Sequence, residues 1–159
     1  GKARVLSRGS DIALISAGIC TEEAMRATRA LREHGVSIEH LHITTHKPFT
    51  DPAVLEAVAK ARYGVITMEN HTIVGGLGSA VAELMAEAGL GKRLVRIGLK
   101  DTYVHGASRS YLMREYGLDA TALVSEIERL IGQRLGITDA DLAAVRLEAV
   151  HSSAKAEAL

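Results

Sequence analysis

A polar cluster followed by glycines lies between an apolar run and a helix-like stretch, at residues 69–84 (ENHTIVGGLGSAVAEL). Glu69 and His71 are an acid and an imidazole near the expected end of a strand, a placement that suits general acid–base chemistry. The glycines that follow could let backbone N–H groups at a helix start bind an anion. The candidate anion-binding loop consists of Gly75, Gly76, Gly78 and Ser79.

The glycine loop lacks the fingerprints of nucleotide-binding loops. Residues 76–81 supply the first two glycines of G-x-G-x-x-G, but Val81 stands at the third position. About 20 residues further on, position 98 is Gly, so no strand-end acid is available for a ribose. No Gly-Lys-Ser/Thr occurs, which excludes a P-loop. A tight turn that lets the next helix approach a sheet closely explains the same glycines.

The polar cluster also lacks a nucleophile. Ser79 is expected at a helix start without the G-x-S-x-G elbow of serine hydrolases. We therefore interpret Glu69, Asn70 and His71 as a buried polar network that anchors an interface with another domain or subunit.

The other histidines allow a metal site without requiring one. His40 and His42 are two residues apart on one expected strand face, and His46 follows. Three imidazoles could ligate zinc, but no carboxylate stands at a recognisable spacing, and a polar strand face beneath a helix or interface explains the pair. No metal site is predicted. The single cysteine, Cys20, excludes an internal disulfide and a cysteine-based metal site, and we expect it to pack in the core.

Composition narrows the class of protein. The chain has 159 residues, about one domain, with zero formal net charge and 3% aromatic residues. These values argue against a nucleic-acid partner, and no apolar run reaches the roughly 18 residues of a membrane span. A cytoplasmic protein is expected. Because the chain begins with Gly1 rather than Met, we expect a piece of a longer protein.

Short apolar runs alternate with helical periods, which predicts an α/β fold, a three-layer α/β/α sandwich around a mostly parallel sheet. Thr21 and Asp51 are the expected helix caps, and a bulge is expected at Glu39–His40. Gly136 divides a domain, residues 1–135, from a helical extension, residues 136–159, that is expected to pack on it or fray. Strands are predicted at 3–6, 11–16, 36–44, 65–68 and 93–99, and helices at 21–34, 51–62, 79–88, 110–116, 120–134 and from 138 onward.

Three motifs in order resemble the C-terminal domain of transketolase-type, thiamine-diphosphate-dependent enzymes. They are GSDIALISAG at 9–18, T-x-K-P at 45–48 and E-N-H-x-x-x-G-G-L-G-S-A-V at 69–81. The resemblance covers about residues 1–135 and is greatest to the separate C-terminal subunit of split bacterial transketolases. One departure is residues 48–50, Pro-Phe-Thr, where the family usually has Pro-Leu-Asp. Another is His46, where an aliphatic residue is common.

The resemblance implies a mixed five-stranded sheet whose first short strand, about residues 3–6, runs antiparallel. In such enzymes thiamine diphosphate and a divalent metal such as Mg²⁺ lie between two other domains. No catalytic, cofactor-binding or metal-binding residue is therefore expected here. The C-terminal domain is known for dimer contacts and scaffolding, so the expected partners are a second copy or the N-terminal catalytic subunit or domains.

The whole enzyme would be a transferase of carbohydrate metabolism that moves a two-carbon ketol unit between sugar phosphates, and this piece would be inactive alone. Two alternatives stay open. One is the C-terminal domain of a 2-oxo-acid dehydrogenase beta subunit or of a deoxyxylulose-phosphate synthase. The other is a regulatory module that binds an anion at residues 75–79.

Overall fold

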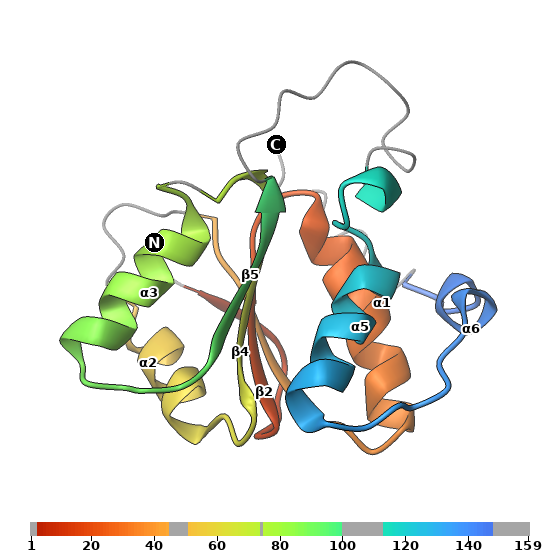
Figure 1. Cartoon of the computed structure of the whole chain (residues 1–159), viewed down its shortest axis with the longest axis horizontal. Helices are drawn as coiled ribbons and strands as arrows, with labels where there is room; N and C mark the ends of the chain where they lie inside the picture. The colour runs from red at the N-terminus through yellow and green to blue at the C-terminus, as the bar shows by residue number, and fades with distance from the viewer. Residues whose placement is uncertain (1–2, 45–50, 74, 100–112, 148–159) are drawn as a thin grey trace.

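The computed structural model describes residues 3–44, 51–73, 75–99 and 113–147. A five-stranded sheet lies between two helical layers (Figure 1). Helices α2 and α3 cover one face, α1 and α5 cover the other, and α6 lies outside α1. This arrangement confirms the predicted three-layer α/β/α class.

The sheet is mixed, as the family resemblance implied. The strand order is β1-β3-β2-β4-β5, and β1 pairs antiparallel with β3 while every other pair is parallel. The β2–α1–β3 crossover lies on one face, and the β3–α2–β4 and β4–α3–β5 crossovers lie on the other. The strands are β1 (Arg4–Ser7), β2 (Ile12–Ser16), β3 (Ile38–His42), β4 (Gly64–Thr72) and β5 (Leu94–Leu99).

The bulge predicted at Glu39–His40 is wrong. Strand β3 pairs with β2 in unbroken register from Ile38 to His42. The irregularity lies in β1, where the register with β3 shifts between Val5 and Ser7. Every residue of β3 is buried, so neither of its faces has to follow an apolar–polar alternation, and the change of phase in the sequence signalled burial on both sides.

The helices are α1 (Cys20–Glu33), α2 (Pro52–Lys60), α3 (Leu77–Glu87), α5 (Ala120–Ile131) and α6 (Asp139–Ala143). Asp51 caps α2 as predicted, since its Oδ1 accepts the N–H of Ala53 at 2.8 Å. Thr21 does not cap α1, which begins one residue earlier with Ile19 at the N-cap and no side-chain cap bond. No helix in the described part of the chain is long and apolar enough to cross a bilayer.

The C-terminal part is less helical than predicted. Thr138 and Asp141 form a reciprocal capping box, but α6 ends at Ala143 and the chain from 144 to 147 is not helical. Of the helix predicted at 110–116, residues 113–115 are helical and residues 110–112 lie outside the described residues, as does the end of the last predicted helix. The side chain of Arg26 in α1 donates to the carbonyls of Leu142 and Val145, both at 3.1 Å, so the described extension packs on α1.

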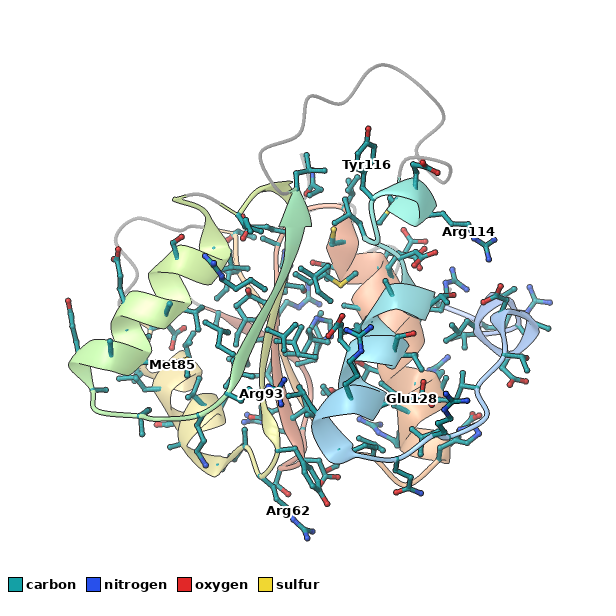
Figure 2. All side chains as sticks on the ribbon, in the orientation of Figure 1. Arg62, Met85, Arg93, Arg114, Tyr116 and Glu128 are labelled. Atoms are coloured by element: carbon teal, nitrogen blue, oxygen red, sulfur yellow. The ribbon has the colours of Figure 1, made fainter. Side chains whose placement is uncertain are left out.

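Two apolar cores stabilise the layers, one on each face of the sheet. Ile12, Leu14 and Ile66 face α1 and α5. Ile15 and Val65 face α2 and α3, with Met85 among their partners. Figure 2 shows side chains filling both spaces between the sheet and the helices. Removal of this surface from water is the main favourable contribution to folding.

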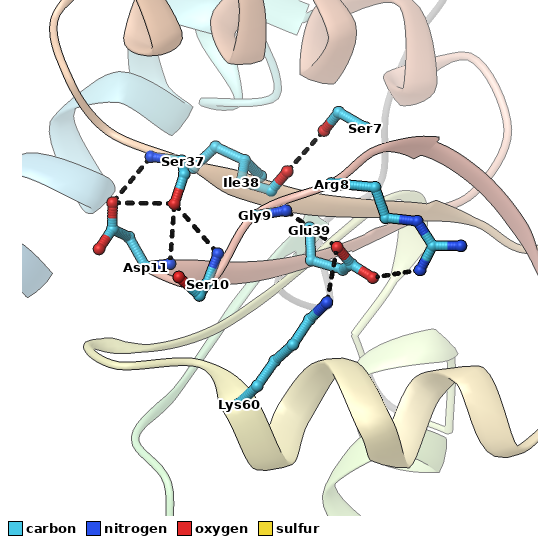
Figure 3. A network of polar contacts seen from close by, with 9 residues as sticks. All are labelled: Ser7, Arg8, Gly9, Ser10, Asp11, Ser37, Ile38, Glu39 and Lys60. Carbon is cyan, nitrogen blue, oxygen red and sulfur yellow. Dashed lines mark hydrogen bonds and ion pairs between the residues drawn. The ribbon is translucent and has the colours of Figure 1, made fainter.

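A buried carboxylate on β3 joins this strand to the β1–β2 connection and to α2 (Figure 3). Glu39 accepts the Gly9 N–H at 2.9 Å and forms ion pairs of 3.0 Å with Arg8 and with Lys60. Burial opposes its ionisation, but the Gly9 N–H, Lys60 and Arg8 outweigh burial and lower the pKa of Glu39 below its usual value. The ionised carboxylate therefore stabilises the folded chain.

Replacing Glu39 with glutamine is expected to lower the free energy of unfolding by about 2 kcal/mol at pH 7, since the ion pairs and charge-assisted bonds are lost. A lowered pKa contributes stability that is present above the unfolded value, near 4.3, and lost as pH falls through the folded value. The difference in the free energy of unfolding between wild type and E39Q should therefore stay constant down to about pH 5 and become smaller at lower pH. Urea unfolding between pH 7 and pH 3 measures this, with exposed Glu56→Gln as the control. A difference that widens in acid would contradict it.

Candidate functional site

Strand β4 continues past its predicted end. It runs from Gly64 to Thr72, so Glu69, Asn70 and His71 belong to the strand rather than to a loop after it. The pairing with β5 shifts between Met68 and Thr72, at the polar cluster. The polar residues did not end the strand because the ladder to β5 resumes beyond them.

Glu69 is turned into the protein and caps helix α3. Its side chain is fully buried. Its Oε1 accepts the N–H of Leu77 at 3.0 Å, and its Oε2 accepts the N–H of Gly78 at 2.9 Å. The N-cap residue, Gly76, has no side chain to perform this role. A carboxylate on β4 thus satisfies two free amides of α3 and lies at the positive end of the helix dipole.

The glycine loop closes on itself and brings α3 close to the sheet. Ser79 Oγ donates to the carbonyl of Ile73 at 3.1 Å and accepts the N–H of Gly75 at 3.2 Å. A Cβ placed on Gly78 would lie 2.7 Å from Arg96 Cδ and 2.9 Å from Thr67 Oγ1, so the start of α3 is in close contact with side chains of β5 and β4. This geometry supports the interpretation of the segment as a strand–turn–helix joint.

The anion-binding loop of Gly75, Gly76, Gly78 and Ser79 stays a prediction. The amides of Leu77 and Gly78 already bind a carboxylate of the same chain. The negative charge of Glu69 would also repel a second anion at this helix start.

The interface role of Glu69, Asn70 and His71 also stays a prediction. Glu69 is committed within the chain, and the side chain of His71 lies outside the described residues. The Asn70 side chain lies against Gly18 in the β2–α1 turn, where a Cβ would come within 2.2 Å of Asn70 Oδ1. Gly18 has a φ of +65°, so both conformation and space favour glycine there.

His40 and His42 lie on the face of β3 that α1 covers, which confirms a polar strand face beneath a helix. His40 contacts Ser16 on β2, and His42 contacts Thr21 in α1. Burial, and secondly the neighbouring His42, lower the pKa of His40 to about 3, so this ring is neutral. His46, the third histidine considered as a zinc ligand, lies outside the described residues.

The start of α3 does not fit a diphosphate group. A diphosphate needs free amides or cations, and at α3 it would meet Glu69 instead. Within the described ranges no three His, Cys, Asp or Glu side chains are arranged to hold a metal ion. Cys20 is fully buried at the start of α1 and packs in the core.

Comparison with known proteins places this fold. Residues 1–123 match the family model of the transketolase C-terminal domain. The chain belongs to the transketolase C-terminal domain family. The match includes the whole sheet, the β4–α3 joint and the start of α5, and it leaves α6 outside.

Three relatives illustrate the range of this family. A protein of Methanocaldococcus jannaschii provisionally named a transketolase C-terminal section is 39% identical, over 80% of this chain and 39% of its own length. A 1-deoxy-D-xylulose-5-phosphate synthase of Chlorobium phaeovibrioides is 37% identical, over 80% of this chain and 20% of its own length. A 6-deoxy-6-sulfo-D-fructose transketolase subunit of a Clostridium species is 37% identical, over 78% of this chain and 38% of its own length.

A solved structure, a split gene transketolase described as an inactive beta4 tetramer, gives a TM-score of 0.72 at 30% identity. The alignment covers 82% of this chain and 42% of that one. The present chain therefore spans between about one fifth and two fifths of the proteins it matches. Its relatives are components of transketolase-family enzymes.

Two features of the site escaped sequence reasoning. Glu69 caps a helix eight residues later in the chain, a distance for which no local capping signature exists. The pairing of Ser16 with His40 joins positions 24 residues apart. Only the register of β2 on β3 brings these two side chains together.

Proposed function

We propose that this chain is the dimerisation and scaffold domain of a transketolase-like transferase that moves a two-carbon ketol unit between sugar phosphates. The observation that carries the proposal is the family match over residues 1–123 in a chain that spans only a fraction of its relatives. The catalytic part of such an enzyme would lie in other domains or in a separate subunit. Its partners would be those domains and a second copy of the same enzyme.

The internal bonding of the polar clusters supports a scaffold rather than a catalytic site. Each carboxylate oxygen of Glu69 accepts a helix amide. The carboxylate of Glu39 is bonded to Arg8, Lys60 and the Gly9 amide. Groups that are buried and paired in this way stabilise a fold and are not available to a substrate. Thiamine diphosphate would supply the carbanion chemistry on the other domains.

The isolated chain is expected to show no saturable binding of thiamine diphosphate with Mg²⁺ by titration calorimetry, and no ketol transfer. The physical reason is that the amides at the start of α3, the helix start that follows the glycine loop, already bind the carboxylate of Glu69. The complete enzyme, with its N-terminal catalytic domains or subunit, should transfer the ketol unit between sugar phosphates. Saturable cofactor binding by the chain alone would overturn the proposal.

The main rival is supported by the similarity to a 1-deoxy-D-xylulose-5-phosphate synthase. The same assay separates the two. Formation of 1-deoxy-D-xylulose 5-phosphate by the complete enzyme, without exchange between sugar phosphates, would assign the chain to that rival. Neither outcome changes the family of the domain.

A further inference from the structure

Four polar side chains form a buried row at the carboxyl ends of β2 and β3 and in the first turn of α1. His40 Nε2 lies 2.7 Å from Ser16 Oγ, Ser16 Oγ lies 2.9 Å from Thr21 Oγ1, and Thr21 Oγ1 lies 2.8 Å from His42 Nδ1. Ser16 and His40 are fully buried, Thr21 is 4% exposed and His42 is 9% exposed. The row joins three elements of the fold through side chains alone.

The number of protons constrains this row. Its three contacts need three donated hydrogens, and the hydroxyls of Ser16 and Thr21 supply one each. One ring nitrogen must therefore donate the third hydrogen. If both rings donated, one hydroxyl would have to donate outside the row, and neither hydroxyl has another acceptor among the described residues. If neither ring donated, one of the three contacts would have no hydrogen.

The other nitrogen of His40 decides which ring donates. His40 Nδ1 is buried and has no partner in the described part of the chain. The ring is neutral, because burial and then His42 lower the pKa of His40 to about 3. A hydrogen on Nδ1 would be a buried, unsatisfied N–H, which is rarer in proteins than an acceptor lacking a donor. The hydrogen therefore lies on Nε2 and points at Ser16.

We infer that the four side chains form a one-way hydrogen-bond chain, His40 to Ser16 to Thr21 to His42, that fixes both imidazoles as Nε2–H tautomers. His42 accepts at Nδ1 and keeps its hydrogen on Nε2. Buried groups on β2, β3 and α1 thus set the ring orientation and the donor atom of His42, because the bond at one imidazole nitrogen determines which nitrogen carries the hydrogen.

Long-range ¹H–¹⁵N correlation spectra of the ring nitrogens in uniformly ¹⁵N-labelled chain at neutral pH test the inference. Both His40 and His42 should give the pattern of a neutral ring with hydrogen on Nε2. A hydrogen on Nδ1 of either ring, or a cationic His42, would overturn the chain. The wild-type spectrum alone decides this.

Two variants of Thr21 provide a matched comparison. Thr21→Ser keeps the hydroxyl, so the His42 spectrum should be unchanged. Thr21→Val keeps the shape without the hydroxyl, so His42 Nδ1 loses this donor and the ¹⁵N shifts of the His42 ring should change. Amide spectra establish that both variants are folded. An unchanged His42 in a folded T21V would contradict the role of Thr21.

Discussion

Replacing Glu69 with alanine is expected to lower the free energy of unfolding by about 4 kcal/mol. The substitution leaves the N–H groups of Leu77 and Gly78 buried without an acceptor, and hydrogen bonds to a charged group contribute roughly 1.5–3 kcal/mol each. It also removes a negative charge from the start of α3, where the helix dipole favours one. Urea unfolding followed by circular dichroism measures the change.

Two further variants isolate the capping role. Glu69→Gln keeps one acceptor oxygen but turns an NH₂ toward a backbone N–H. Its loss of unfolding free energy should therefore be about half of the loss in Glu69→Ala. Glu83→Ala lies on the exposed side of the same helix and should change stability by less than about 0.5 kcal/mol. A loss below about 1 kcal/mol for E69A would show that the two bonds contribute little.

Glu69→Ala also tests the alternative that the glycine loop binds an anion. In wild type the carboxylate occupies the helix amides, so added sulfate should not stabilise the chain specifically. In E69A these amides are free, and sulfate should raise the midpoint of thermal unfolding more than in wild type. A saturable effect of sulfate on wild type, absent when Ser79 is replaced by alanine, would instead support an anion site at the glycine loop.

Much of the fold could be predicted from the sequence because its signals are local. An Asp–Pro pair favours a helix start whatever its tertiary surroundings, and Asp51–Pro52 indeed begins α2. The apolar run at 11–16 likewise corresponds to the buried strand β2. The antiparallel β1 carries no strong local signal. Its antiparallel direction was expected only through the family resemblance and is confirmed by its pairing with β3.

The polar residues were harder to place because their partners are distant in the sequence. Thr21 has the residue type and position of an N-cap, but its hydroxyl bonds to Ser16 and His42. Glu69 has the type and position of a catalytic acid, but it binds amides beyond the turn. In both cases tertiary geometry, which spacing does not encode, decides the role of the side chain.

Replacing Gly9 with alanine is expected to destabilise the chain by about 3 kcal/mol through steric conflict alone. A Cβ at this position would lie 2.4 Å from the backbone nitrogen of Ile38 and 2.5 Å from the carbonyl carbon of Ser37. These are backbone atoms of the segment that opens β3, so no rotamer change can relieve the contact. Urea unfolding measures the loss.

Relief of this contact would require the connection between β1 and β2 to move, and that connection is bonded on both sides of Gly9. The Gly9 N–H donates to Glu39, and Asp11 exchanges hydrogen bonds with Ser37. Gly91→Ala is the matched control, because a Cβ there meets no heavy atom within 4 Å. It should leave stability within about 0.5 kcal/mol of wild type or raise it slightly, as Gly-to-Ala changes do at compatible positions. Equal effects of the two substitutions would show that the β1–β2 connection yields easily, and that the bonds of Glu39 and Asp11 do not hold it in place.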